Sequence, residues 1–133
     1  MARLPEHPNK KTVLVVDDNA TVLKTVSAFL ESDYKVLTAA NGKEALEQSV
    51  AFKADIHLLL SDFQMPGMTG VELATEITAQ RPKIKVLLMS GFPGGMLVLN
   101  EGWHFLAKPF IPSQLKTLVK GLVLPNAKSK FKA

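Results

Sequence analysis

The chain has 133 residues, of which 47% are hydrophobic and 21% are charged, a composition that predicts one globular domain and excludes a disordered or collagen-like chain. It contains no cysteine, which excludes a disulfide scaffold, a thiolate metal site and a cysteine nucleophile and fits a reducing cytoplasm. No apolar run reaches the roughly 18 residues of a membrane span, and the N-terminus lacks the apolar stretch of a secretory signal. We therefore expect a cytoplasmic domain that does not bind a membrane.

The net charge of +4 is concentrated at the two ends of the sequence. Residues 1–11 carry +2 and residues 125–133 carry +3, which leaves −1 for residues 12–124. The central part therefore has no positive excess to attract a phosphate backbone, and we expect no direct binding of nucleic acid. The sequence predicts one domain over residues 12–124 with a basic tail on each side.

Short apolar runs rich in β-branched residues alternate with amphipathic runs along residues 12–124. The apolar runs predict strands that are buried on both faces, and the amphipathic runs predict helices. In chain order we expect a strand at 13–17, a helix over 22–30 capped by Asn19, a strand at 35–39, a turn at Gly42 followed by a helix at 43–52, a strand at 56–60 that contains His57, a helix at 69–80, strands at 84–89 and 103–107, and a helix from Pro112 to about Leu122. Residues 94–102 predict only a short or irregular helix, because Gly94 and Gly95 disfavour helical structure.

This alternation predicts an α/β fold, in which a doubly wound sheet of five parallel strands carries helices on both faces. Ligands of such sheets bind outside the carboxyl ends of the strands. Chemistry-bearing residues stand at four of these ends, namely Asp17 and Asp18, Asp62, Ser90, and Lys108. The sequence therefore predicts that these side chains meet at one edge of the sheet.

Each of these residues alone has a structural explanation, such as helix capping by Asp18 and its neighbour Asn19. Three carboxylates at one edge, however, repel one another unless a cation neutralises them. A ligand set of oxygens without His or Cys favours a hard cation, Mg²⁺ above all. Ser90 and Lys108 then remain to hold an anion beside the metal. This combination indicates a phosphoryl site with an aspartate nucleophile.

Four segments carry a resemblance to a known family. They are VLVVDDN (13–19), DFQMPGMTG (62–70), LLMSG (87–91) and FLAKPF (105–110). In this order and at this spacing, residues 12–124 resemble the receiver domain of two-component response regulators, whose flavodoxin-like fold is the doubly wound sheet inferred above. The segments MSGFPG and GWHFLAKPF are most similar to the corresponding segments of receivers attached to hybrid sensor kinases.

The resemblance implies a role for each acidic residue. Asp62 is the phosphoacceptor that attacks a phosphohistidine of a partner kinase. Asp18 and Asp62 bind Mg²⁺ directly together with the backbone carbonyl of Gln64, and Asp17 helps directly or through water. Phosphorylation would add charge at Asp62 and bias a two-state surface.

The resemblance also implies how the phosphoryl group is held and sensed. Ser90 donates a hydrogen bond to the phosphoryl group, Lys108 pairs with one of its oxygens, and Gly91 leaves room beside it. Phe105 occupies the position of an aromatic switch that turns inward when Ser90 moves; a plain core phenylalanine is the alternative. A cis peptide bond is expected before Pro109, because X-Pro bonds tolerate the cis form.

The partners implied by the resemblance are a sensor histidine kinase or a histidine phosphotransfer protein as phosphodonor, and a downstream protein or a fused output domain as target. A phosphorelay intermediate or sink of a hybrid kinase is a close variant, and a homodimer stays open. Residues 92–102 depart from many receivers, since the run is about one helical turn shorter than usual. Inferences about the partner surface there are the ones most affected.

Three other classes of protein fit the sequence less well. A Mg²⁺-dependent phosphatase of the haloacid dehalogenase type needs a second aspartate two residues after the nucleophile, where this chain has Gln64. A flavodoxin-like cofactor module needs a first loop that cradles phosphate, whereas Asp17 and Asp18 repel it. A degenerate receiver is disfavoured because all the acidic and basic site residues are present. We expect no enzyme beyond self-catalysed phosphorylation and dephosphorylation of the aspartate.

Overall fold

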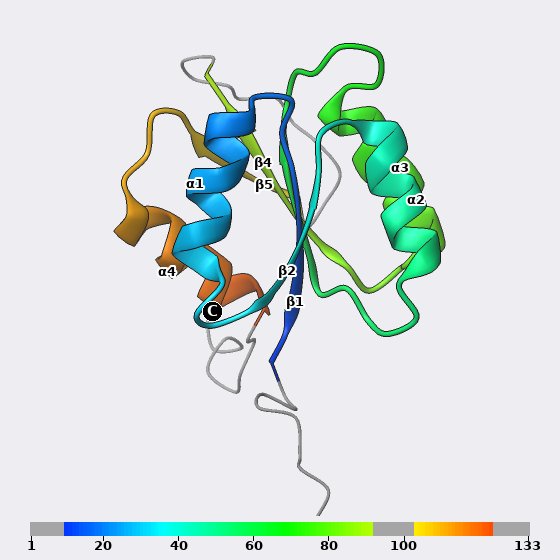
Figure 1. Cartoon of the computed structure of the whole chain (residues 1–133), viewed down its shortest axis with the longest axis horizontal. Coiled ribbons are helices and arrows are strands. Elements are labelled where there is room, and N and C mark those ends of the chain that lie inside the picture. The colour runs from blue at the N-terminus through cyan, green and yellow to red at the C-terminus, as the bar shows by residue number, and fades with distance from the viewer. Residues whose placement is uncertain (1–9, 92–102, 124–133) are drawn as a thin grey trace, which may run out of the picture.

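A computed structural model describes residues 10–91 and 103–123 of the chain (Figure 1). Its elements, in chain order, are β1 (Thr12–Val16), α1 (Ala20–Leu30), β2 (Lys35–Ala39), α2 (Gly42–Ala51), β3 (Leu58–Asp62), α3 (Gly70–Gln80), β4 (Lys85–Ser90), β5 (Trp103–Ala107) and α4 (Pro112–Val123). The expected elements in these ranges are confirmed to within a residue or two. The short or irregular helix expected at 94–102 lies outside the described residues. No helix in the described ranges is long and apolar enough to cross a membrane.

The five strands form one parallel sheet in the order β2-β1-β3-β4-β5. Helices α1 and α4 lie side by side on one face and α2 and α3 on the other (Figure 1). Alternate residues of the central strands point to opposite faces, so that Leu58 and Leu60 enter the core under α1 and α4 while Leu59 enters the core under α2 and α3. All three are fully buried. The predicted doubly wound sheet is therefore confirmed.

Side-chain caps fix where the helices begin. The Oδ1 atom of Asn19 accepts from the backbone N–H of Val22 at 3.0 Å, which confirms Asn19 as the N-cap of α1. Asn41 caps α2 in the same way, with its Oδ1 atom 2.8 Å from the backbone nitrogen of Glu44. As a result Gly42 is the first residue of α2, and the expected turn at Gly42 is wrong.

The third strand begins two residues later than expected, because the side chain of His57, the residue just before it, takes the place of a backbone acceptor at the start of β1. The backbone N–H of Thr12 donates to Nδ1 of His57 at 3.0 Å rather than to a backbone carbonyl. The regular pairing of β1 with β3 therefore starts at Val13 and Leu58. The expected placement of His57 inside the strand is wrong: this residue lies just before β3, and its Nδ1 atom accepts the hydrogen bond from Thr12.

Candidate functional site

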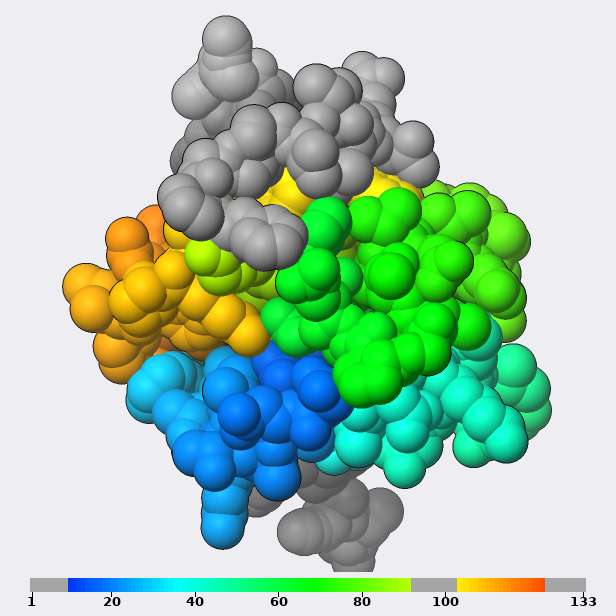
Figure 2. All heavy atoms as spheres, turned by 90° about the horizontal axis from the view of Figure 1, so that it is seen from above, coloured from blue at the N-terminus to red at the C-terminus, as the bar shows by residue number. Residues whose placement is uncertain are grey.

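The carboxyl ends of the strands bring the predicted residues to one edge of the sheet. Asp17 follows β1, Asp62 ends β3, Ser90 ends β4, and Lys108 follows β5. The register places Asp62 opposite Met89 and Ser90 opposite Ala107. Viewed onto this edge, the residues after β1 (blue), after β3 (green) and after β5 (gold) lie next to one another (Figure 2).

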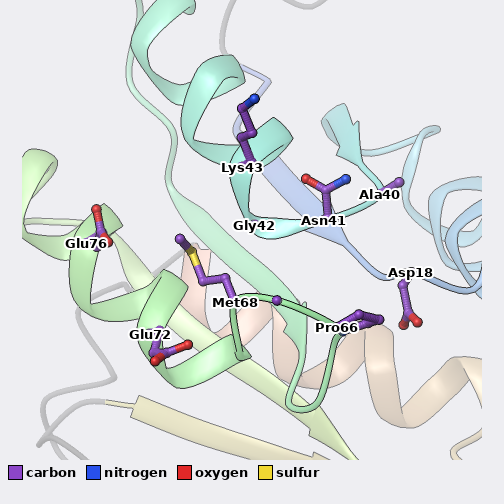
Figure 3. Close-up of a pocket in the computed structure, with 10 residues that line it drawn as sticks. Asp18, Ala40, Asn41, Gly42, Lys43, Pro66, Met68, Glu72 and Glu76 are labelled. Carbon is purple, nitrogen blue, oxygen red and sulfur yellow. The ribbon is translucent and has the colours of Figure 1, made fainter.

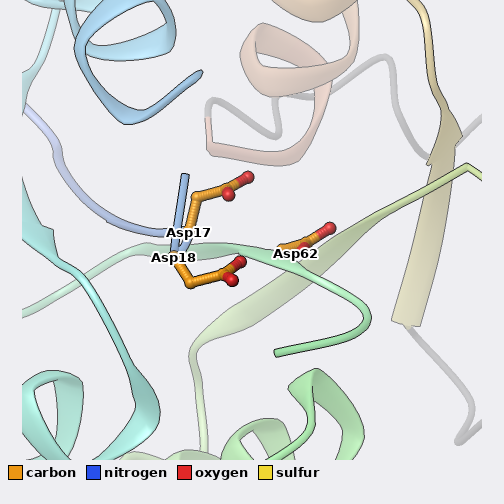
Figure 4. A group of neighbouring side chains, drawn as sticks. All are labelled: Asp17, Asp18 and Asp62. Carbon is orange, nitrogen blue, oxygen red and sulfur yellow. The ribbon is translucent and has the colours of Figure 1, made fainter. Parts of the chain in front are cut away.

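Three carboxylates form the centre of this edge. One carboxylate oxygen from each of Asp17, Asp18 and Asp62 lies within 4.8 Å of the others, and Figure 4 shows the three side chains gathered at the ends of two neighbouring strands. Asp17 is 1% exposed, whereas Asp18 is exposed. The buried carboxylate of Asp17 also accepts from the backbone N–H of Asn19 at 2.9 Å, which holds the loop between β1 and α1 in place. A set made only of carboxylate oxygens fits a hard divalent cation.

Lys108 is the cation that this cluster already contains. Its Nζ atom donates to Oδ1 of Asp62 at 2.9 Å and lies 3.4 Å from Oδ2 of Asp17. The backbone N–H of Lys108 donates to the carbonyl of Ser90 at 2.7 Å, which ties the end of β5 to the end of β4. The Lys108–Pro109 peptide bond is cis, as expected.

The pKa values of Asp62 and Lys108 reflect this crowding. Burial raises the pKa of Asp62, the hydrogen bond from Lys108 opposes that rise, and the negative charges of Asp17 and Asp18 add to it. For Lys108 burial acts to lower the pKa, but the hydrogen bond that it donates to Asp62 and the charges of Asp17 and Asp62 outweigh burial and raise it. Lys108 therefore stays protonated at neutral pH, while the carboxylates exceed what one ammonium can neutralise.

The loop after β3 holds Asp62 firmly from the other side. The backbone N–H of Phe63 donates to the carbonyl of Met89 at 2.7 Å, and the N–H of Gly70 donates to the carbonyl of Phe63 at 2.9 Å. A Cβ atom at Gly70 would overlap the carbonyl oxygen of Asp62. Helix α3 can therefore begin against the end of β3 only because residue 70 is glycine.

A capping box fixes the same end of α3. Thr69 Oγ1 accepts from the backbone N–H of Glu72, and Glu72 Oε1 accepts from the backbone N–H of Thr69. The T-x-x-E pattern at residues 69–72 is the sequence signal of this box. The box matters for the site because it anchors the far end of the loop that follows Asp62.

Phe105 contacts an aromatic residue that the sequence analysis did not single out. Its ring centroid lies 5.7 Å from that of Phe63, with the ring planes tilted by 55°. Both side chains are half-buried and pack on the core under α2 and α3. The residue that follows the expected phosphoacceptor is thus in direct contact with the expected switch position. No short-range sequence signal could reveal this pair, since it joins residues of β5 and of the loop after β3.

A cleft of about 750 Å³ opens beside the carboxylates. It lies between the loops that follow β1, β2 and β3, and Asp18, Met68 and Glu72 are among its lining residues (Figure 3). Met68 packs against Gly42, where an added Cβ would come within 2.8 Å of the Met68 Cβ atom. This methionine therefore packs against the start of α2. The cleft gives solvent and small solutes a route to the exposed side of the carboxylate cluster.

A second, apolar groove of about 470 Å³ runs between α1 and the loop that joins β5 to α4. Val22, Val26 and Phe29 line it from α1, and Lys108 and Phe110 line it from the opposite side. Lys108 therefore belongs both to the carboxylate cluster and to the wall of an apolar groove.

The structure leaves the roles of two other expected residues as predictions. Gln64 lies two residues beyond Asp62 in the loop that leads to α3, with an exposed side chain; metal binding by its carbonyl remains a prediction. Ser90 is 5% exposed at the end of β4, a position that fits an expected partner of the phosphoryl group.

Comparisons with known proteins agree on one family. A family model described as the response regulator receiver domain matches residues 13–120. The chain is 30% identical over 117 residues to the hydrogenase transcriptional regulatory protein HoxA of Cupriavidus necator, covering 84% of this chain and 24% of that protein. It is 34% identical over 115 residues to the sensor kinase CckA of Brucella abortus, covering 84% of this chain and 12% of that protein. The chain thus spans a quarter or less of these two relatives.

Solved structures show the same similarity. The receiver domain of the hybrid histidine kinase CckA superposes with a TM-score of 0.75 at 31% identity, over 84% of this chain and 98% of that one. The response regulator TrrA of Thermotoga maritima, solved in complex with Mg²⁺ and beryllofluoride, gives a TM-score of 0.74 at 30% identity, over 84% of this chain and 98% of that one.

Proposed function

The chain belongs to the response regulator receiver domain family and is a receiver domain of two-component signalling, and from this membership we propose that Asp62 is its phosphoacceptor. The observation that carries the proposal is the position of Asp62 itself. Its carboxylate ends β3 within 4.8 Å of two further carboxylates and accepts a 2.9 Å hydrogen bond from Lys108. In the proposal the domain spans residues 12–124.

The proposed reaction is transfer of a phosphoryl group from a phosphohistidine. A carboxylate oxygen of Asp62 attacks phosphorus and forms the new O–P bond, the P–N bond breaks, and the departing imidazole nitrogen keeps the electron pair. Both reactants are anionic, so repulsion opposes their approach. Lys108 holds a positive charge beside the attacking carboxylate of Asp62 without having to move into place, and Ser90 offers a hydroxyl donor to a phosphoryl oxygen.

Mg²⁺ is the cofactor that we propose for this site. Asp18 and Asp62 would bind it directly with the carbonyl of Gln64, and Asp17 would help directly or through water. When bound, the ion supplies positive charge that offsets the phosphoryl oxygens. The donor set fits because it contains only oxygen ligands and because its carboxylates exceed the charge of the single ammonium of Lys108.

The proposed phosphodonor is a sensor histidine kinase or a histidine phosphotransfer protein. We propose that it docks in the apolar groove between α1 and the loop after β5, because Lys108 lines both this groove and the acceptor site. A donor helix seated against Val22 and Phe29 would bring its phosphohistidine to Asp62 without crossing the rest of the surface. The exposed Ile111, at 58% exposure, extends the apolar surface next to this groove.

The proposed output is a change of partner-binding surface. The contact of Phe105 with Phe63 supports a switch role for Phe105, because it links the switch position to the residue after Asp62. The target is a downstream protein or a fused output domain, or the domain is an intermediate or sink of a phosphorelay; homodimer formation stays open. We propose no enzyme activity beyond the formation and hydrolysis of the phosphoaspartate. We also propose that the domain is cytoplasmic.

Incubation with acetyl phosphate and Mg²⁺, followed by intact mass measurement, tests the proposal. We expect the mass of one phosphoryl group on the wild-type protein and none on Asp62→Asn. The matched control is Glu47→Gln, which neutralises an exposed carboxylate of α2 far from the cluster and should label like the wild type. Equal labelling of the Asp62→Asn variant would place the acceptor elsewhere.

A further inference from the structure

Another cleft, of about 590 Å³, lies at the opposite edge of the sheet, where the strands begin. This edge of the sheet is at the bottom of Figure 1. Backbone hydrogen bonds set its layout. The N–H of His57 donates to the carbonyl of Thr12 at 2.9 Å, and the N–H of Lys85 donates to the carbonyl of His57 at 3.1 Å. The first residues of β1, β3 and β4 therefore stand in one row, and the lysines next to them share one surface.

The charges of the two clefts have opposite signs. Four basic residues and one acidic residue line the cleft at the strand starts; they are Lys11, Arg81, Lys83, Lys85 and Asp55. Three acidic residues and one basic residue line the cleft beside the carboxylates; they are Asp18, Glu72, Glu76 and Lys43. Residues 12–124 carry an overall charge of −1, although three of the four basic residues of this cleft, Arg81, Lys83 and Lys85, lie among them. The basic cleft is thus a local feature of the fold and not a consequence of net charge.

The fold itself uses only part of this basic charge. The guanidinium of Arg81 donates to the carbonyls of Ser49, Phe52 and Ala54 at 2.8–2.9 Å and so closes the end of α2. Lys11, Lys83 and Lys85, by contrast, make no side-chain hydrogen bond and no ion pair with any residue in the ranges 10–91 and 103–123. Three ammonium groups are therefore gathered in one cleft, and Asp55 is the one acidic side chain among its described lining residues.

Two of the lysines also act on neighbouring histidines. Burial lowers the pKa of His57, and the charge of Lys11 lowers it further, against the smaller opposing effect of Asp55. Burial likewise lowers the pKa of His104, and the charge of Lys85 adds to that effect. A positive potential that acts on neighbouring groups acts equally on an anion that approaches from solvent.

Apolar side chains line the basic cleft beside its charged residues. Ile56 and Ile84 line it from the loops before β3 and β4, and Leu122 and Val123 line it from the end of α4. We propose that this cleft docks an acidic peptide segment of a partner protein, with carboxylates on Lys11, Lys83 and Lys85 and an apolar side chain against the partly exposed Leu122 at the end of α4. A concave cleft with apolar walls suits such a segment better than a nucleic acid duplex, whose outer surface is made of phosphates. The proposal is independent of the phosphorylation of Asp62.

Fluorescence anisotropy of a labelled glutamate-rich peptide with one central leucine tests the docking site on the full chain. We expect saturable binding that weakens as salt rises. The double variant Lys83→Glu/Lys85→Glu should bind about tenfold more weakly or worse, because like charges then face the peptide. The double variant Lys83→Arg/Lys85→Arg keeps both charges and should bind like the wild type.

The matched control is Lys24→Glu/Lys116→Glu, which makes the same change of net charge on exposed positions of α1 and α4. It should leave the affinity within about twofold, since exposed charges beyond a Debye length of roughly 10 Å are screened. Replacement of the peptide leucine by glycine should weaken binding. No saturable binding, equal loss in the control, or tighter lysine-dependent binding of duplex DNA of matched charge would overturn the proposal. Circular dichroism confirms the fold of each variant.

Discussion

The ammonium nitrogen of Lys108 lies 2.9 Å from Oδ1 of Asp62 and 3.4 Å from Oδ2 of Asp17. One cation thus serves two carboxylates that come from different strands, with the lysine itself supplied by the end of a third. The Asp62 side chain is 13% exposed and that of Asp17 is 1% exposed, so solvent screens these charges weakly. The arrangement keeps a positive charge beside the proposed acceptor before any phosphodonor arrives.

The first prediction concerns this lysine. Lys108→Arg keeps the charge but replaces a compact ammonium by a planar guanidinium. We expect Asp62 still to accept a phosphoryl group, while the response of β5 to beryllofluoride and Mg²⁺ falls by about fivefold, the effect of losing roughly 1 kcal/mol of hydrogen bonding. Hydrogen exchange of residues 103–107 measures the response. The control Lys116→Arg, at an exposed position of α4, should respond like the wild type. An undiminished response of Lys108→Arg would show that Lys108 takes no part in the switch.

A second prediction concerns the metal. Asp18→Asn removes the exposed carboxylate of the cluster and leaves Asp17 and Asp62 in place. We expect the dissociation constant for Mg²⁺ to rise by about tenfold or more, which corresponds to a loss of roughly 1.4 kcal/mol of binding free energy. Isothermal titration calorimetry of metal-free protein measures it, and Glu47→Gln should titrate like the wild type. If Asp18→Asn binds Mg²⁺ as tightly as the wild type, the ligand set is wrong.

A third prediction follows from the raised pKa of Asp62. Its ordinary pKa is 3.8, and burial together with Asp17 and Asp18 raises it in the folded state. A carboxyl with a raised folded-state pKa destabilises the fold at every pH above that raised value, and this penalty disappears as pH falls below 3.8. Asp62→Asn should therefore increase the free energy of unfolding of metal-free protein at pH 7 by on the order of 1 kcal/mol.

Urea denaturation in the presence of a chelator measures this change in stability. Saturating Mg²⁺ should reverse the order of the two proteins, because an ion at a hundredfold its dissociation constant stabilises the wild type by about 2.7 kcal/mol. A metal-free Asp62→Asn protein that is less stable than the wild type at pH 7 would show that Lys108 more than neutralises the cluster.

A fourth prediction concerns the pH dependence that His57 produces. Its pKa in the folded state is lowered from 6.5 by burial and by Lys11, and its Nδ1 atom must be unprotonated to accept from Thr12. The stabilisation that neutral His57 gives the folded state is therefore complete above pH 6.5. It is lost as the pH falls from 6.5 through the lowered pKa of the folded state, because the unfolded chain binds the proton first. His57→Asn keeps an acceptor without titrating, so the difference in stability between the wild type and this variant should change across that range. A constant difference would exclude the histidine as its cause.

The parts of the site that were predictable from sequence are those fixed by strand ends. Asp17, Asp62 and Lys108 each stand next to an apolar run, and parallel strands place such positions at one edge. The charge of the site, its oxygen ligands and the caps of the helices can be predicted from the types of residues that stand close together in the sequence. These features need no knowledge of which strands are neighbours.

The remaining features depend on which residues meet across the fold. The side chain of His57 replaces a backbone acceptor for Thr12, and this shifts the start of β3 against the hydrophobic pattern. The contact of Phe63 with Phe105 depends on the order β3-β4-β5 and on two side-chain rotamers. Alternation of apolar and polar residues contains no information about either, because it reports burial and not the partner.

The most direct test of the central claim is to identify the residue that carries the phosphoryl group. After reaction with acetyl phosphate and Mg²⁺, borohydride reduces an aspartyl phosphate to homoserine, and tandem mass spectrometry of the digested protein locates the altered residue. We predict homoserine at position 62 alone, and none when Mg²⁺ is withheld by a chelator. Homoserine at position 17 or 18, or a phosphoryl group on another type of residue, would contradict the account.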